Sequence, residues 1–142
     1  MKKVLVSVLL ILALLMAVSC KTSPATDETF GKIYDKYIDR LILDGAAEYT
    51  VKGGDSLSKI SQTFYNDQFY YPVIMLASRN VVLDPDKIQP GMVLIIPDLQ
   101  KNLQDTRAKA AIKGVITDCI PIEKERRGDS SAGRMRDLAR SL

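Results

Sequence analysis

The sequence predicts an α+β fold in which two short strands enclose two helices. Apolar and polar residues alternate over 49–52, and an apolar, largely β-branched run covers 92–96. Each of these patterns is typical of a strand. Between them, apolar residues recur at helical spacing in two segments that the polar stretch 66–68 separates. The order strand, helix, helix, strand makes a compact two-layer unit of 49 residues, from 49 to 97.

The chain of 142 residues opens with a segment that is typical of exported proteins. Two lysines precede the run from Val4 to Val18, which is apolar apart from Ser7. At 1.5 Å per residue this run spans about 22 Å, less than the ~30 Å hydrocarbon core of a bilayer. We therefore expect residues 1–19 to be a signal peptide that is removed and takes no part in the fold.

Cys20 stands directly after this segment, in the sequence AVSC. These four residues resemble a bacterial lipobox, whose cysteine receives a lipid and becomes the mature N-terminus, although Ala17 replaces the usual leucine. An ordinary signal peptidase site is the alternative. We expect lipidation at Cys20, with a lipidated linker over residues 20–25. Each buried CH₂ contributes about 0.8 kcal/mol, so two or more acyl chains anchor a protein firmly.

Residues 26–48 predict an amphipathic helix. Asp27 and Glu28 suit its first turn and Gly45 suits its end, so the helix should run from about 26 to 44. We expect its apolar face to cover the neighbouring domain, and a partner-binding helix is the alternative. The apolar residues that recur at helical spacing are Phe30, Ile33, Tyr34, Tyr37, Ile38, Leu41 and Ile42.

The segment VKGGDSLSKI, from residue 51 to 60, raises the question whether Ser56 is a nucleophile, because GDSL also marks a family of esterases and lipases. A catalytic serine needs a neighbouring base, and the chain contains no histidine. A lysine base needs a desolvated pocket, which nothing around Lys52 or Lys59 suggests. We expect that Asp55 or Ser56 instead caps the helix that follows.

A second helix is expected to begin near Pro72, because proline suits the first helical position, and to end at Asn80. A loop over residues 81–89 then leads to the dipeptide Pro90-Gly91. This dipeptide fits the centre of a type II turn, directly before the second strand.

Beyond Pro97 the sequence predicts a helical extension over 98–127 and a flexible basic tail over 128–142. Asp98 can cap a helix from 98 to 113 that ends at Gly114. We expect Cys119 to be a small buried side chain, with an intermolecular disulfide as the alternative. The charges of the tail favour a disordered state, and a short helix over 134–142 is the alternative.

Residues 49–97 resemble a LysM domain, a carbohydrate-binding module with βααβ order. The resemblance rests on YTVKGGDSLSKIS, on Asn80 and on DPDKIQPGMVLIIP, which occur at matching spacing. The chain departs from the shortest members in its longer and more aromatic segment, Tyr65 to Tyr71, and it has a single copy of the module. These aromatic side chains offer a platform for stacking on sugars, but we expect them to fill the core of a module that lacks tryptophan.

The resemblance implies binding of N-acetylglucosamine-containing glycans, chiefly peptidoglycan and chitin, in a shallow groove between two loops. Glycines let the backbone approach a sugar, whose acetamido group needs a donor, an acceptor and a small apolar recess. The alternative is that both loops only close the fold. The groove residues that the resemblance implies are Gly53, Gly54, Asp55, Ser56 and Leu57 on one side and Asn80, Val81, Val82, Leu83 and Ile88 on the other.

These features predict a non-catalytic lipoprotein that links an envelope membrane to peptidoglycan. The residue after Cys20 is Lys21 and not aspartate. By resemblance to lipoprotein sorting in bacteria with two membranes, this indicates the outer membrane, facing the periplasm. The module carries four basic and four acidic residues, which argues against nucleic acid as a partner. Nothing indicates a cofactor or a metal. The alternatives are an envelope assembly protein that docks a partner through helices 26–44 and 98–113, or a targeting subunit for a wall hydrolase, without sugar binding.

Overall fold

The computed structural model describes residues 25–142, so the predictions for residues 1–19, for Cys20 and for the linker up to residue 24 lie outside the described residues. The described part has an α+β fold with a two-stranded antiparallel sheet, as predicted. Short 3₁₀ turns cover Ile38–Arg40, Gln68–Tyr70 and Pro85–Lys87. The other elements in chain order are α2 (Ala25–Tyr37), β1 (Ala47–Thr50), α3 (Leu57–Tyr65), α4 (Tyr71–Ala77), β2 (Val93–Ile96), α5 (Leu99–Gln104), α6 (Thr106–Arg127) and α7 (Asp129–Ser141).

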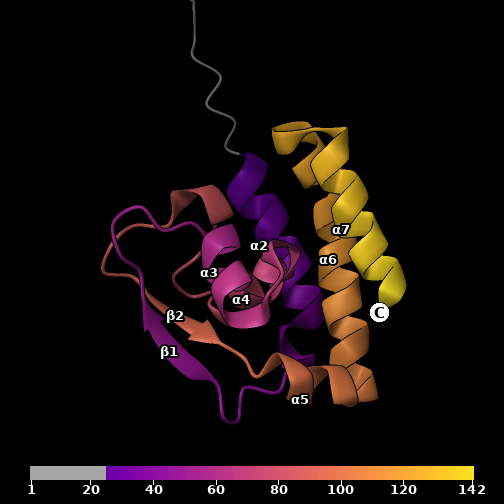
Figure 1. The fold of residues 1–142 in the computed structure, drawn as a ribbon, viewed down its shortest axis with the longest axis horizontal. Coiled ribbons are helices and arrows are strands. Elements are labelled where there is room, and N and C mark those ends of the chain that lie inside the picture. Colours follow the sequence, from indigo (N-terminus) through magenta and orange to yellow (C-terminus); the bar gives the residue numbers. More distant parts are fainter. Residues whose placement is uncertain (1–24) are drawn as a thin grey trace, which may run out of the picture.

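The sheet and the first two helices after β1 form the predicted βααβ unit. Figure 1 shows α3 and α4 together on one side of the sheet, with α2, α6 and α7 beyond them. Leu94 is completely buried, whereas Val93 on the outer face is 44% exposed. β1 begins at Ala47, two residues before the predicted start, because Ala47 and Glu48 pair with Ile96 and Ile95. The partner strand, and not the alternation of β1 itself, therefore sets the length of the ladder.

The N-terminal helix is shorter than the predicted helix over 26–44. α2 ends at Tyr37, and the backbone is already extended at Leu41. The side chain of Asn102, which is completely buried, explains the early end: its Oδ1 accepts from Ile42 N at 2.9 Å and its Nδ2 donates to Ile42 O at 2.9 Å. A residue whose N–H and C=O both bond to a distant side-chain amide cannot continue the hydrogen-bond pattern of the helix.

The helix predicted over 98–113 is two helices, and its predicted end at Gly114 is wrong. Asp105 separates α5 from α6 and caps α6, accepting from Ala108 N at 2.7 Å. α6 then continues through Gly114 to Arg127. A Cβ atom at Gly114 would lie only 2.7 Å from Cζ of Tyr37. The glycine therefore permits the close approach of α2 to α6 and does not end a helix.

The predicted flexible tail is helix α7, which packs antiparallel to α6 (Figure 1). Met135 and Ala132 are completely buried, and Ala139 is nearly so. The many charged residues of α7 lie on its outer face, where they remain in water and have little effect on the free energy of folding. The few apolar residues of α7 are enough to hold it in place, because they pack against an apolar face of α6.

α6 also carries buried residues around which the described part of the chain packs, Ile112, Val115, Ile116 and Cys119 among them. Cys119 is a free, completely buried thiol, as expected, and burial raises its pKa to about 12. Within residues 25–142, no helix combines the length and the apolar character needed to cross a membrane.

Candidate functional site

The loop that follows β1 and the turn that leads from the second loop into β2 lie side by side. Val51 N donates to Met92 O at 2.8 Å, and Gly91 N donates to Val51 O at 2.9 Å. These bonds extend the ladder of β1 and β2 by one step, so the loop after β1 and the loop before β2 leave the same end of the sheet (Figure 1). The Pro90-Gly91 turn forms as predicted: Gly91 has φ of +93°, and Met92 N donates to Gln89 O at 3.2 Å.

The first loop, residues 51–57, is held by side chains of the loop itself and of the residues beside it. The Asp55 carboxylate accepts from Lys52 N at 2.9 Å and from the Tyr49 hydroxyl at 2.7 Å. These two hydrogen bonds hold the pKa of Asp55 below its ordinary value. Lys59 Nζ donates to Gly54 O at 2.8 Å. Apart from the bonds of Val51 to Gly91 and Met92, the hydrogen bonds that hold the loop therefore join residues within 49–59.

Two glycines open the backbone of this loop to solvent. Gly53 and Gly54 are both exposed, and a Cβ atom added at either would meet nothing within 4 Å. Gly54 has φ of +84°, a conformation that favours glycine. The space beside the backbone at Gly53 and Gly54 is therefore open to a ligand, although Gly54 O already accepts from Lys59 Nζ.

Ser56 is the N-cap of α3, which answers the question raised by GDSL. Its Oγ accepts from Lys59 N at 3.3 Å, and its backbone is extended, as a cap requires. Of the two caps that the sequence allowed, Ser56 holds the helix and Asp55 holds the loop. The cap places Leu57 in the core, where it is 2% exposed, so only the backbone of Leu57 can face a ligand.

Replacing Ser56 by alanine should lower the free energy of unfolding by about 0.5 to 2 kcal/mol, because an amide of the first helical turn loses its acceptor. Urea denaturation of the two chains measures this difference. Ser58→Ala is the matched control, because the Ser58 hydroxyl makes no hydrogen bond in the described structure. Neither chain should hydrolyse a generic ester. Ester turnover by the parent that Ser56→Ala abolishes would contradict the capping role.

The second loop, from Ser78 to Ile88, presents apolar side chains to solvent. Val81 is 45% exposed and Leu83 is 55% exposed, whereas Val82 between them is 2% exposed. Asn80 is exposed and Ile88 is half-buried. Of the predicted groove residues on this side, Val82 therefore belongs to the core by its side chain, and the others lie at the surface.

α4 ends three residues before Asn80, the predicted end, because Ser78 ties this point of the chain to β2. The Ser78 hydroxyl accepts from Ile95 N at 2.8 Å and donates to Ile95 O at 3.3 Å. Asn80 therefore lies in the loop and not in the helix. No sequence pattern indicates this role of Ser78, because a serine at a helix end has many possible partners.

The far end of the second loop is bound to α6. Arg126 Nη1 donates to Asp84 Oδ1 at 2.8 Å, and Arg126 Nη2 donates to Asp84 Oδ2 at 2.9 Å. Asp84 is only 4% exposed, and the guanidinium holds the pKa of its carboxyl below the ordinary value. Sequence analysis missed this pair, because 42 residues separate its members and neither belongs to a recognisable motif.

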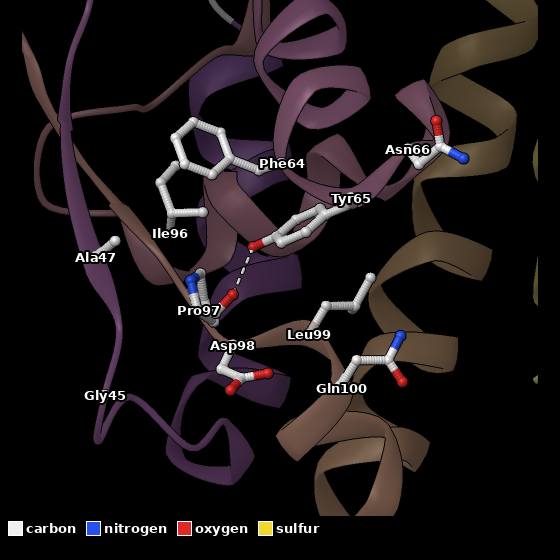
Figure 2. A pocket seen from close by; sticks show the side chains of 10 residues that line it. All are labelled: Gly45, Ala47, Phe64, Tyr65, Asn66, Ile96, Pro97, Asp98, Leu99 and Gln100. Atoms are coloured by element: carbon white, nitrogen blue, oxygen red, sulfur yellow. Dashed lines mark hydrogen bonds between the residues drawn. The ribbon is translucent and has the colours of Figure 1, made fainter.

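A hollow of about 400 Å³ lies elsewhere, at the opposite end of the sheet (Figure 2). Gly45, Phe64, Ile96 and Leu99 are among the residues that line it. Tyr65 crosses it and donates from its hydroxyl to Pro97 O at 3.0 Å. The other aromatic residues of the segment 65–71 are buried, as expected for core residues. This hollow contains none of the predicted groove residues.

No group of side chains within residues 25–142 has the composition and spacing to hold a metal ion. The acidic side chains of the second loop, Asp84 and Asp86, are already paired with Arg126. The chemistry available at the two loops is therefore hydrogen bonding by exposed peptide groups, with apolar contact from Val81 and Leu83.

Comparison with known proteins agrees with this geometry. The LysM domain model matches residues 49–97. The chain is 53% identical over 53 residues to an uncharacterized protein of Deinococcus radiodurans, and 48% identical over 50 residues to the potassium binding protein Kbp of Escherichia coli O6:H1. It is 44% identical over 57 residues to an esterase of Mycobacterium tuberculosis. No solved structure matches the chain significantly.

Each similarity covers only a part of both proteins. The matched segments make up 37%, 35% and 40% of this chain, and 20%, 34% and 12% of the three relatives, respectively. The similarity to the esterase lies in the LysM region, which is the βααβ unit, so it concerns a binding module. Together with the strand pairing and the helix order, the match shows that residues 49–97 form a LysM domain, a non-catalytic module of a family that binds peptidoglycan and related glycans.

Proposed function

We propose that this chain is a non-catalytic, lipid-anchored protein that binds the N-acetylglucosamine-containing glycan of peptidoglycan between the loops 51–57 and 78–88. The proposal rests on the fact that the loop after β1 and the segment before β2 leave the same end of the sheet, and on two surfaces that these parts of the chain present to solvent. One is the open backbone at Gly53 and Gly54, and the other is the exposed apolar pair Val81 and Leu83. An acetamido group matches both, because its amide needs hydrogen bonds and its methyl group needs apolar contact.

The burial of Leu57 and Val82 narrows the predicted set of contact residues. Both side chains are 2% exposed and pack in the core. They contribute backbone groups at most, so side-chain contact falls to Asn80, Val81, Leu83 and Ile88. Asp55 and Ser56 are already engaged in hydrogen bonds within the loop, and therefore support the shape of the groove more than they bind sugar.

A single shallow site of this kind binds weakly, with a dissociation constant in the micromolar to millimolar range. This range corresponds to a favourable binding free energy of about 4 to 8 kcal/mol. Lipid anchoring compensates for the weak affinity, because a tethered domain meets the wall at an effective concentration of about millimolar. In this proposal the lipid on Cys20 fixes the protein in an envelope membrane, the outer membrane facing the periplasm, and the LysM domain holds that membrane to the wall.

Sedimentation of the chain from residue 21 onward with purified sacculi tests the proposal. LysM residues 49–97 are neutral by count, so binding should persist from about 0.05 to 0.5 M salt, over which screening shortens the reach of exposed charges severalfold. Soluble N-acetylglucosamine oligomers should compete. Binding that vanishes with salt and ignores the oligomers would instead favour an assembly protein or a targeting subunit for a wall hydrolase. The apolar face of α2 is already buried, so such a partner would need another surface.

Cys20→Ala should move the protein from the membrane fraction to the soluble periplasmic or culture fraction, because it removes the acylation site. Fractionation of cells and immunoblotting measure the distribution. Ser19→Ala is a suitable control, because it keeps both the small residue and the cysteine. Full retention in the membrane without Cys20 would contradict lipid anchoring and point to the apolar run from Val4 to Val18 as an uncleaved anchor.

A further inference from the structure

We propose that Arg126, a residue outside the LysM domain, is a positioning residue for the glycan groove, because it fixes the loop that forms the second wall. The inference rests on the proposed function, since it assigns a role in the same site. It makes the helical extension part of the binding unit and not an independent segment of the chain.

The contact between Arg126 and the loop is bidentate and well shielded. Two parallel hydrogen bonds of 2.8 and 2.9 Å join the guanidinium to both oxygens of Asp84, and Nη1 also reaches Asp86 Oδ2 at 2.8 Å. The side chains of Arg126 and Asp84 are 19% and 4% exposed. Bidentate arginine pairs define direction as well as distance, so this contact fixes the orientation of Asp84 and not only its position.

Asp84 in turn fixes the backbone that surrounds it. Its Oδ1 accepts from Asp86 N at 2.9 Å, and its carbonyl accepts from Lys87 N at 3.0 Å, which together form the 3₁₀ turn Pro85–Lys87. Val82 on the other side of Leu83 is anchored in the core. Leu83 is therefore held between two buried neighbours, and the 55% exposure of its side chain follows from the anchoring of both.

The guanidinium is itself held in place from a second direction. Its Cζ lies 5.3 Å from the centre of the Phe30 ring on α2. The next residue, Arg127, bonds to Asp86 and, through Nη1 at 2.9 Å, to Glu123. The second loop is thus joined to α2 and α6, both of which lie outside the LysM domain.

The loop 51–57, which forms the first wall of the groove, does not depend on side chains outside the LysM domain. Tyr49, Lys52 and Lys59, which hold the loop 51–57, all belong to the LysM domain. Loss of the Arg126 contact should therefore disturb one wall of the groove and leave the other intact. A residue that only stabilised the fold would not produce this asymmetry.

The test is titration of the chain from residue 21 onward with the soluble β-1,4-linked pentamer of N-acetylglucosamine, at a temperature where circular dichroism shows every variant fully folded. Arg126→Gln should raise the dissociation constant about tenfold, and Arg126→Lys, which keeps the charge but loses the bidentate geometry, should raise it less. Tyr71→Phe is the matched control, because it removes a buried hydrogen bond to α6 without touching either loop. Its dissociation constant should equal that of the unaltered chain.

Amide hydrogen exchange locates the effect. In Arg126→Gln, the amides of residues 81–88 should exchange faster, while those of 51–57 should keep their rates. Equal affinities for the unaltered chain and Arg126→Gln, or equal losses in Arg126→Gln and Tyr71→Phe, would overturn the role of Arg126 and leave the proposed function standing. If the unaltered chain itself fails to bind the pentamer and sacculi, the proposed function fails first, and this role falls with it.

Discussion

Replacing Glu123 by alanine is expected to lower the free energy of unfolding by about 3 kcal/mol, the largest single effect on stability that the structure predicts. The Glu123 carboxylate is 2% exposed and joins three helices. It accepts from the Tyr71 hydroxyl of α4 at 2.9 Å, from Arg127 Nη1 of α6 at 2.9 Å and from the Ser131 hydroxyl of α7. Its removal leaves a buried hydroxyl without an acceptor and breaks the link between these helices.

The magnitude follows from the exposure of the partners. Breaking a buried ion pair costs about 3 to 5 kcal/mol, and the lower end applies here because Arg127 is 35% exposed and keeps Asp86 as a partner. A loss of this size is a large fraction of the 5 to 15 kcal/mol that is typical of whole domains.

Urea denaturation followed by circular dichroism measures the effect of Glu123→Ala. Glu125→Ala is the control, because Glu125 lies on the same turn of α6 with its side chain exposed, and the change should alter stability by less than about 0.5 kcal/mol. A similar loss in both variants would mean that Glu123 acts through helix propensity and not through its buried contacts.

The second large effect concerns binding. Leu83→Asp is expected to raise the dissociation constant for the N-acetylglucosamine pentamer about tenfold or more, because a carboxylate at this position must lose water against the acetamido methyl group. Leu83 is 55% exposed and makes little contact with the core, so the substitution should leave the folded state intact. Calorimetric titration measures the affinity, and circular dichroism checks the fold.

Leu43→Asp is the matched control for Leu83→Asp. Leu43 is also exposed, at 41%, but it lies between α2 and β1, at the end of the sheet opposite to the two loops. The same change of charge at Leu43 should therefore leave the affinity unchanged. Equal weakening by both substitutions would show that general charge governs binding, and unaltered affinity in Leu83→Asp would exclude the second loop from the site.

Both experiments use the chain from residue 21 onward and not an isolated LysM fragment. α4 belongs to the LysM domain, but its residues Ile74, Met75 and Leu76 are completely buried in a core that includes α6. A fragment that ends near residue 100 would expose part of this apolar surface to water. The described part of the chain therefore behaves as one structural unit.

The sequence alone determined the features that depend on short-range chemistry. The βααβ order, a cap at Asp55 or Ser56, the proline at the start of α4 and the turn at Gly91 were predicted, and the last three depend on residues within four positions of one another. The exposed walls of the candidate groove were predicted in part for the same reason. Glycines and an apolar loop are visible in the sequence, whereas the burial of Val82 is not.

Only the tertiary structure decided the features that depend on distant partners. α2 stops because Asn102 bonds the N–H and the C=O of Ile42, and α6 continues through Gly114, where Tyr37 of α2 occupies the space that a side chain would need. The segment after Gly128 is a helix because α6 offers an apolar face to Met135. In each case the local sequence allows two conformations of similar free energy. A contact with a residue more than twelve positions away, which propensity and periodicity do not contain, selects one of them.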